Sequence, residues 1–336
     1  MTTSEFKESL LESKNIVILS HQNPDGDAIG SALSLCRFLK TIGNEATVIM
    51  PNETADTMSI ICGYDTVIYN NKDSEKAATL VEKAEILIFV DLNDIKTRIG
   101  DIHTAVERNT TAKRAIIDHH VSSPDPSIDF IYADSTASST GLLIYRLIND
   151  MGMADKIDIE TANAMYIGMM TDTGNFSYGF LTAELFETVA KLIKIGISPQ
   201  ILNGAIYNTN SEERMRLWGY VMSEKMVILH DLKAAYITLT TEELRRFKYK
   251  EGDTEGLVNV PLSIAGIENS AMFSEKEGFV RISLRSTGQD GEDMNVFAHE
   301  TYNGGGHRNA SGARSKESME MCVVKFVDGM RKARKK

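Results

Sequence analysis

Four short apolar segments rich in branched residues recur in the first 120 positions, and helix-compatible sequence separates them. They are NIVILS at 15–20, ATVIM at 46–50, EILIFVD ending at Asp91 and KRAIID ending at Asp118. Continuous apolar runs of this length are typical of strands buried on both faces of a parallel sheet. The pattern predicts an α/β domain with a mostly parallel sheet flanked by helices.

The order of the remaining segments predicts a second, smaller domain. Amphipathic segments near 140–151, 158–170 and 182–195 are followed by the helix breakers Gly196 and Pro199, so a first domain is expected over residues 1–197. Residues 198–226 have the pattern of a helical connector. A hairpin in MVILHDLKAAYITLT, a strand in GFVRISLRS and a final helix predict a mixed α/β domain over 227–336.

Composition limits the substrates and the compartment. The 36 basic and 47 acidic residues give a net charge of −11, which repels long nucleic acid and suits a short anionic substrate. The three cysteines lack CxxC spacing, which argues against a disulfide framework or a zinc knuckle and favours a reducing cytoplasm. Neither a signal peptide nor an apolar run long enough to span a bilayer is apparent, so no membrane partner is expected.

Acidic and histidine side chains gather where the predicted strands end. In open α/β sheets, ligands bind outside the carboxyl ends of the strands, so loops from different strands can converge on one crevice. Carboxylates suit hard divalent cations, and imidazole extends the choice toward manganese, iron or zinc, which favours a two-metal centre. The candidate ligand segments contain His21, Asp25, Asp27, Asp91, Asp118, His119, His120 and Asp172.

Each of these segments also has a purely structural interpretation. PDGDAIGS is compatible with an Asx turn that caps a helix, and the two interpretations are evenly balanced for that segment alone. DHH is compatible with a polar loop, but consecutive titratable groups after an apolar strand are costly to bury without a partner. Taken together, the segments favour the metal site.

The ordered segments resemble a known family. HQNPDGDAIGS, VDLND, DHH and TDTGNFSY are similar to the four motifs of the DHH phosphoesterase superfamily, and GGGHRNASG resembles the glycine-rich signature of the DHHA1 domain. The match spans residues 21 to 312, and within the superfamily the chain resembles the stand-alone nanoRNase/pAp phosphatase proteins. The resemblance implies a catalytic DHH domain followed by a substrate-binding DHHA1 domain.

The resemblance also implies a role for each motif residue. His21, Asp25 and Asp91 would hold one divalent cation, and Asp27, Asp91, His119 and Asp172 would hold another, with Asp91 bridging the two. Asp118 would orient His119, and His120 would donate to the substrate phosphate. The implied cofactors are two manganese ions, and the implied reaction is hydrolysis of a phosphoester by a water that the metals activate.

Phosphate binding is expected in the second domain. Consecutive glycines Gly304, Gly305 and Gly306 can form a backbone anion nest next to His307, although a glycine turn before a helix is the structural alternative. Arg285 and Ser286 are expected as phosphate ligands, since the planar arginine fork suits phosphate, and Asn309 is expected in the same pocket.

The expected function is hydrolysis of short single-stranded oligoribonucleotides, linear dinucleotides such as pApA, or the 3′-phosphate of pAp. The alternatives are a polyphosphatase or pyrophosphatase, a cyclic di-AMP phosphodiesterase, a RecJ-like exonuclease, and a nucleotide-binding sensor without turnover. GGGH argues against the family II pyrophosphatases, which carry a different C-terminal domain, and the intact ligand set argues against the sensor. The sequence leaves the oligomeric state open, with a homodimer among the alternatives.

Overall fold

The computed structural model describes residues 1–92, 94–120, 126–250, 252–288 and 290–334. The chain divides into two compact units, Met1–Thr209 (unit 1) and Asn210–Lys336 (unit 2). The segment expected as a helical connector is shared between them. Helix α9 (Pro199–Tyr207) belongs to unit 1, and α10 (Glu212–Tyr220) belongs to unit 2.

Unit 1 is built on a six-stranded parallel sheet with the strand order β3-β2-β1-β4-β5-β6. The four apolar segments of the sequence form β1, β2, β4 and β5, so the predicted parallel α/β fold is confirmed. The remaining strands are two short ones at the edges. The strands are β1 (Asn15–Leu19), β2 (Glu45–Met50), β3 (Ile68–Tyr69), β4 (Ile86–Val90), β5 (Lys113–Asp118) and β6 (Phe130–Ala133).

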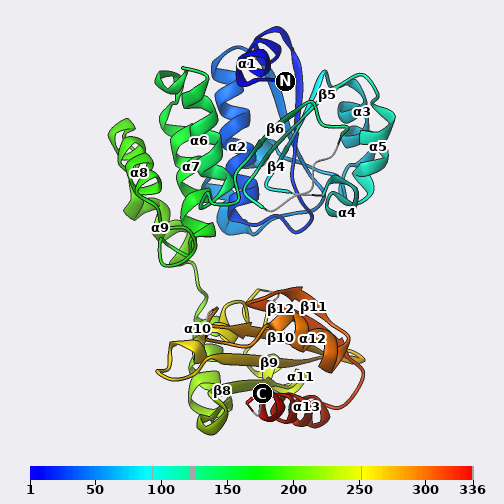
Figure 1. Ribbon diagram of the computed structural model, residues 1–336, viewed down its shortest axis with the longest axis vertical. Helices are drawn as coiled ribbons and strands as arrows, with labels where there is room; N and C mark the ends of the chain where they lie inside the picture. The colour runs from blue at the N-terminus through cyan, green and yellow to red at the C-terminus, as the bar shows by residue number, and fades with distance from the viewer. Residues whose placement is uncertain (93, 121–125, 251, 289, 335–336) are drawn as a thin grey trace. The chain divides into compact units, whose positions relative to one another are not determined.

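Helices cover both faces of this sheet (Figure 1). Successive side chains of β1 enter different cores: Ile16 and Ile18 pack with α2, α6 and α7, whereas Val17 and Leu19 pack with α3 and α5. This explains why the strands are apolar throughout rather than alternating. The helices of unit 1 besides α9 are α1 (Thr3–Glu12), α2 (Gly26–Thr41), α3 (Ser74–Lys83), α4 (Ile95–Arg98), α5 (His103–Arg108), α6 (Thr140–Asp150), α7 (Ile159–Asp172) and α8 (Ala183–Ile195).

The strand order places a topological switch point at the carboxyl end of β1. The chain crosses from β1 to β2 on one side and reaches β4 on the other, so the strand order reverses beside β1. At such a switch point the loops diverge and leave room for a ligand. His21 lies just beyond β1 and Asp91 directly follows β4, so both lie at this switch point.

Glycines let α2 and α7 approach closely. A Cβ atom at Gly30 of α2 would lie 2.8 Å from the carbonyl oxygen of Ala164, and one at Gly168 of α7 would lie 2.6 Å from Oδ1 of Asp27. No real Cβ tolerates such distances to fixed atoms. The two helices can therefore pack this closely only because both positions are glycine. The close approach fixes Asp27, in the first turn of α2, against α7.

We expect Gly168→Ala to lower the free energy of unfolding by about 1–3 kcal/mol, because the new methyl overlaps the Asp27 carboxylate in a packed core. The same substitution should reduce turnover, since it displaces a candidate metal ligand. Thermal unfolding and activity measure the two effects. The matched control is Gly204→Ala in α9, where the nearest atom to a new Cβ is the Asn208 side chain at 3.7 Å. Equal behaviour of the two variants would contradict the packing argument.

Unit 2 contains a mixed six-stranded sheet with the order β11-β12-β10-β9-β8-β7. Strands β8 and β9 are parallel and the other neighbours are antiparallel. The predicted 226–240 hairpin, the strand in GFVRISLRS and the final helix are confirmed, whereas β9, β11 and β12 were not foreseen. The elements are β7 (Met226–Leu229), β8 (Ala234–Leu239), β9 (Asn269–Lys276), β10 (Phe279–Ser286), β11 (Gly305–His307), β12 (Ala310–Ser315), α11 (Thr241–Arg246), α12 (Met294–Tyr302) and α13 (Met319–Ala333).

The two faces of this second sheet are covered differently. Helices α12 and α13 pack on one face around Phe273, Phe297 and Phe326. The opposite face is covered next to β8 and β9 by a second cluster that includes Leu217 of α10 and Leu244 of α11. In the described part of the chain, no helix is long and apolar enough to cross a membrane.

Candidate metal centre

The loop after β1 carries the first candidate ligands. His21 is buried at 6% exposure. Asp25 is the N-cap of α2, and its Oδ1 accepts hydrogen bonds from the backbone N–H groups of Asp27 and Ala28. The Asx cap and the ligand interpretation of PDGDAIGS are therefore compatible, since the cap uses one carboxylate oxygen. Asp27, in the first helical turn, is 1% exposed.

Asp91 occupies the centre of the cluster. It has φ +57, a left-handed conformation that Asp and Asn tolerate better than other non-glycine residues. This backbone conformation directs the two carboxylate oxygens of Asp91 toward two different histidines. Oδ2 lies 3.5 Å from Nε2 of His21, and Oδ1 lies 3.6 Å from Nε2 of His119.

The remaining ligands complete two groups of donor atoms. Nε2 of His119 lies 3.5 Å from Oδ2 of Asp172, at the end of α7. The donor atoms within 4.8 Å of one another form three overlapping sets: His21, Asp25 and Asp91; Asp27, His119 and Asp172; and Asp91, His119 and His120. The structure thus brings together all eight side chains predicted at the strand ends once Asp118, hydrogen-bonded to His120, is included.

His21 and His119 present Nε2 to the cluster, whereas His120 faces Asp91 with Nδ1, at 3.7 Å. Nδ1 of His21 lies 2.8 Å from the carbonyl oxygen of Gln22, and Nδ1 of His119 lies 3.4 Å from that of Ala137. Nδ1 of His120 lies 2.8 Å from Oδ1 of Asp118. An acceptor at Nδ1 favours the tautomer protonated there, which leaves Nε2 of His21 and His119 with a lone pair for a cation.

The donor set fits divalent cations. Two donors about 2.1 Å from one cation and about 90–110° apart are separated by about 3.0–3.4 Å, close to the histidine–carboxylate distances in the cluster. Among the described residues, no lysine or arginine forms an ion pair with Asp25, Asp27, Asp91 or Asp172. Buried carboxylates without a cationic partner are strongly unfavourable, and cations between them remove that cost.

The pKa shifts follow from the same crowding. Burial, then repulsion from Asp91, Asp172 and Asp25, raises the pKa of Asp27 well above its usual value. Burial likewise raises the pKa of Asp172 to about 6, although the His119 charge opposes the shift. Burial alone would raise the pKa of Asp91, but its hydrogen bond to His21 and the nearby histidine charges lower it overall. Of these three carboxylates, Asp91 therefore stays ionised most readily.

Three residues that support the cluster were missed at the sequence level. The backbone N–H groups of Thr140 and Gly141, at the start of α6, donate to the Asp27 carboxylate at 2.6 and 2.9 Å. Ser31 Oγ also donates to Asp27, and Thr140 Oγ1 donates to Oδ1 of Asp91. A helix N-terminus favours negative charge. The signal is present in DSTASSTG, whose Ser139 caps α6, because a run of serines and threonines before an apolar segment is typical of a helix N-terminus.

The expected role of Asp118 needs a correction. Its Oδ1 accepts from Nδ1 of His120, not from His119, whose Nδ1 faces the Ala137 carbonyl instead. Asp118 is the last residue of β5 and its carboxylate is fully buried. It contacts His120, the second residue after the strand, rather than His119, the first. The hydrogen bond to Asp118, partly offset by burial, raises the pKa of His120.

We expect Asp118→Asn to lower kcat/KM by about 10–100-fold, because a carboxylate that orients a functional histidine is lost. Since the carboxylate raises the pKa of His120, its loss should lower that pKa and move the alkaline limb of the kcat/KM profile to lower pH. A pH profile of the variant measures the shift. A uniform loss at every pH would contradict this assignment, because it would indicate a structural role only.

In unit 2, strand alternation separates Arg285 from Ser286. Arg285 lines a groove of about 470 Å³ on one face of the sheet, whereas Ser286 lies on the buried side at 8% exposure. The two side chains therefore lie on opposite faces of the sheet, and the structure does not bring Ser286 to the groove that Arg285 lines. Antiparallel register instead places Arg285 opposite Ala310, and Ala310 opposite His307, so Arg285 and His307 belong to one face.

The glycine-rich segment is a hairpin rather than an open nest. The N–H of Gly304 donates to the Ala298 carbonyl, and that of Gly306 donates to Asn295 Oδ1, so these amides are engaged within the protein. A Cβ at Gly304 would lie 2.3 Å from the Gly312 carbonyl oxygen, which makes glycine necessary for strand pairing. Gly305 lines the groove, and Asn309 lies in the exposed hairpin turn.

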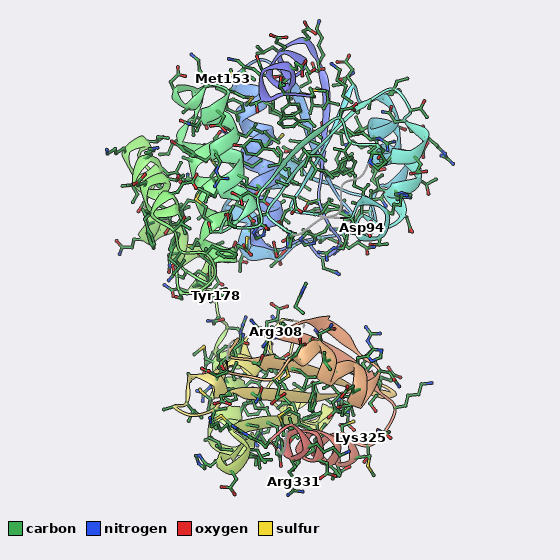
Figure 2. All side chains as sticks on the ribbon, viewed as in Figure 1. Asp94, Met153, Tyr178, Arg308, Lys325 and Arg331 are labelled. Atoms are coloured by element: carbon green, nitrogen blue, oxygen red, sulfur yellow. The ribbon has the colours of Figure 1, made fainter. Side chains whose placement is uncertain are left out.

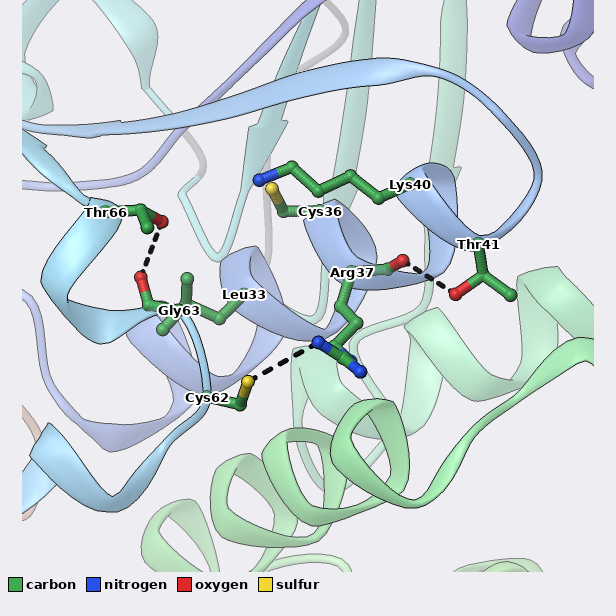
Figure 3. Close-up of a pocket in the computed structure, with 8 residues that line it drawn as sticks. All are labelled: Leu33, Cys36, Arg37, Lys40, Thr41, Cys62, Gly63 and Thr66. Carbon is green, nitrogen blue, oxygen red and sulfur yellow. Dashed lines mark hydrogen bonds between the residues drawn. The ribbon is translucent and has the colours of Figure 1, made fainter.

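Not every polar residue near a strand end joins the centre. Asp94, labelled in Figure 2, accepts from the N–H groups of Lys96 and Thr97 and caps α4. A separate cavity of about 250 Å³ beside the C-terminal half of α2 is shown in Figure 3. It contains Arg37 and Cys62 and none of the predicted ligands.

Comparison with known proteins places this geometry in context. Residues 15–169 match the family described as "DHH family, N-terminal domain". A solved structure from Bacteroides fragilis, an exopolyphosphatase-related protein, is 37% identical, with a TM-score of 0.93 over 98% of this chain and 95% of that chain. The bifunctional oligoribonuclease and PAP phosphatase NrnA of Bacillus subtilis is 28% identical over 89% of this chain and 88% of its own length. RecJ from Thermus thermophilus, solved with Mn²⁺, is 13% identical with a TM-score of 0.57 over 99% of this chain and 54% of RecJ, and shares the fold.

Proposed function

Because the chain belongs to the DHH family of phosphoesterases, we propose that it hydrolyses short oligoribonucleotides, linear dinucleotides of the pApA type, or pAp. The homologues support a hydrolase that acts on nucleotide phosphoesters.

The observation that carries the proposal is the position of Asp91 between two sets of donor atoms. Its Oδ2 faces His21 and its Oδ1 faces His119, at 3.5 and 3.6 Å. A carboxylate with both oxygens engaged in this way suits a bridge between two cations, with His21 and Asp25 on one side and Asp27, His119 and Asp172 on the other. RecJ, which shares the fold, was solved with Mn²⁺, and this supports a divalent cation at the centre.

The side chains of the site have different roles in the proposed reaction. Bound divalent cations supply Lewis-acid activation of water and stabilise charge on the phosphoryl oxygens. Asp27 is held by Thr140, Gly141 and Ser31, so its carboxylate keeps a fixed direction. His120 is oriented by Asp118 and keeps Nε2 for a hydrogen bond to the substrate phosphate. A raised pKa makes His120 a better donor to that anion.

Two observations support the proposed substrate class. The Bacillus subtilis relative, an oligoribonuclease and PAP phosphatase, aligns with 89% of this chain and therefore with both units. In unit 2, the register of β10, β12 and β11 places Arg285 and His307 on one face of the sheet. Cationic and hydrogen-bonding side chains on one face suit a terminal phosphate.

The deciding experiment is a turnover assay with manganese on a panel of substrates: pApA, pAp, pentaadenylate, cyclic di-AMP and inorganic polyphosphate. We expect hydrolysis of the first three and little of the last two. The control is the Asp27→Asn variant, which should lose activity on every substrate and so exclude a contaminating nuclease. Activity confined to polyphosphate would overturn the proposal.

Arg285→Gln is expected to lower kcat/KM on pApA by about one to two powers of ten, because a charge-assisted hydrogen bond to phosphate is lost. Metal content should remain that of the wild type, and bis-p-nitrophenyl phosphate, which needs little docking, should lose less. Ser286→Ala is the matched control, since Ser286 lies on the other face of the sheet. Equal losses on both substrates would indicate that Arg285 does not act by holding the nucleotide.

A polyphosphatase is the second candidate, and one specific observation favours it. The Bacteroides fragilis structure at 37% identity is described as exopolyphosphatase-related. Inorganic polyphosphate offers the same phosphoryl oxygens to the metal centre but no base or ribose. The same panel separates the two candidates, because a polyphosphatase would release phosphate from polyphosphate faster than it cleaves pentaadenylate.

A further inference from the structure

An exposed tyrosine lies close to the candidate metal centre. Tyr178 is 62% exposed and lies in the loop that follows Asp172, the candidate ligand at the end of α7. Partial burial, and then the charges of Asp172 and Asp25, raises the pKa of its hydroxyl, so the side chain lies within electrostatic range of both candidate ligands. In the described part of the chain, the Tyr178 hydroxyl has no hydrogen-bond partner and no other aromatic ring stacks on this side chain.

The loop that carries Tyr178 has a strained backbone. Gly174, Asn175 and Phe176 have φ values of +52, +58 and +59, so three consecutive residues adopt the left-handed conformation. A bulky side chain such as that of phenylalanine disfavours this conformation, and the surrounding structure must therefore hold it in place. Residues in such conformations are concentrated at functional sites, which makes this turn a candidate for a role at the neighbouring metal centre.

Contacts on the buried side keep the turn in place. The ring centre of Phe176 lies 5.7 Å from that of Tyr166, and the Phe176 N–H donates to Oγ1 of Thr173 at 3.1 Å. The carbonyl oxygen of Thr173 accepts a hydrogen bond from the N–H of Tyr178, also at 3.1 Å. These contacts fold the chain back on itself, so that Tyr178 returns to Gly174.

The glycine at position 174 lets the tyrosine ring lie against the backbone. A Cβ atom at Gly174 would lie 1.9 Å from Cε1 of Tyr178, and 2.4 and 2.8 Å from the adjoining ring atoms Cζ and Cδ1. These distances place that position over the ring rather than beside its edge, so one face of the ring rests on Gly174. The exposure of Tyr178 therefore belongs mainly to the opposite face. A ring supported on one face and open on the other can stack on a planar ligand.

A nucleotide is a planar ligand that suits this position. Its base can stack on an aromatic side chain whatever the base is, because every base has a π-face. The base is joined to its phosphate through a single ribose, so a phosphate at the metal centre brings a base close to Tyr178. Inorganic polyphosphate has no planar group, and the tyrosine ring would not contribute to its binding.

We propose that the open face of Tyr178 stacks on the base of the nucleotide whose phosphate lies at the metal centre. Tyr178 thereby determines the preference of the site for nucleotides over inorganic polyphosphate. This inference rests on the proposed function and deepens it, because it names a specificity-determining residue of the same site.

The test compares AMP with ribose 5-phosphate, which lacks the base, by isothermal titration calorimetry on the manganese-loaded full-length protein. We expect Tyr178→Leu to weaken AMP binding about tenfold and ribose 5-phosphate binding less than about twofold, because leucine still covers Gly174 but has no aromatic face. Tyr178→Phe keeps the ring and should bind AMP within about threefold of the wild type. The control is Leu11→Ala, since Leu11 is exposed on α1, at the end of unit 1 away from Tyr178 (Figures 1 and 2).

Each of three results would overturn the inference. Equal losses of AMP and ribose 5-phosphate binding in Tyr178→Leu would show that the side chain only holds the turn after Asp172. Loss of bound manganese in that variant would show the same. A Tyr178→Phe variant as weak as Tyr178→Leu would assign the contact to the hydroxyl rather than to the ring.

Steady-state turnover of pAp gives a readout that a merely structural role would not produce. Stacking on the base is equally strong in the ground state and the transition state, so its loss should raise KM and leave kcat unchanged. We expect Tyr178→Leu to raise KM for pAp about tenfold and to keep kcat within about threefold of the wild type. A fall in kcat with an unchanged KM would contradict the stacking role.

Two outcomes separate this inference from the proposed function. If AMP binding depends on the Tyr178 ring but pApA, pAp and pentaadenylate are not hydrolysed, the proposed function fails while the stacking assignment is supported. If pAp and pApA are hydrolysed but Tyr178→Leu binds AMP like the wild type, only the stacking assignment fails.

Discussion

Asp91→Asn is expected to lower kcat/KM by on the order of 10³-fold or more and to reduce the number of bound cations. The reason is that Asp91 faces donor atoms of both sets, through Oδ2 toward His21 and Oδ1 toward His119. Asparagine keeps the shape of the side chain and tolerates the φ of +57 at this position, so the backbone turn should survive. Alanine would add backbone strain to the loss of the ligand.

Metal content by mass spectrometry and steady-state rates measure the effect of Asp91→Asn. Asp94→Asn is a matched control three residues along the chain, because Asp94 caps α4 and belongs to none of the donor sets. That control should keep turnover within about twofold of the wild type, since an asparagine also caps well. A variant at Asp91 that retains two cations and near-normal turnover would rule out the bridge.

Removing divalent cations should abolish activity, and manganese should restore it better than magnesium, because imidazole is a poor ligand for magnesium. The stabilisation by manganese should also grow with pH. Asp172 has a folded-state pKa of about 6 against a usual value of 3.8, and burial is the main cause. Between pH 3.8 and about 6, the metal-free folded state therefore holds a proton that the unfolded state has released. The stability of the metal-free protein should fall as pH rises through this range.

The affinity for cations should change with pH in the opposite direction to the stability of the metal-free protein. Cations need the deprotonated carboxylates, so their affinity should rise as pH passes about 6, with protons released on binding. Asp27, whose pKa is also raised, acts in the same direction. Thermal unfolding with and without manganese at pH 5 and pH 8 measures the effect, and the shift in Tm should be larger at pH 8. Equal shifts at both pH values, or equal rates with magnesium, would count against these assignments.

Much of unit 1 was accessible from local sequence. An apolar run of five or six residues buried on both faces must be a central strand, and β1, β2, β4 and β5 lie where these runs occur. The position of His21, Asp91 and Asp118 at the ends of such runs then predicts their convergence, because parallel strands end at one edge. Unit 2 was less accessible, since β9 and β12 lack continuous apolar runs and pair through long-range register.

The sequence by itself determined the parallel sheet of unit 1 and the set of acidic and histidine residues at its carboxyl edge, because strand periodicity and side-chain chemistry are local properties. Only the tertiary structure decided which of these residues touch. It paired Asp118 with His120, supplied the amides of Thr140 and Gly141 to Asp27, and turned Ser286 to the buried face. These outcomes depend on strand register and helix packing between segments far apart in the chain, and no local pattern specifies them.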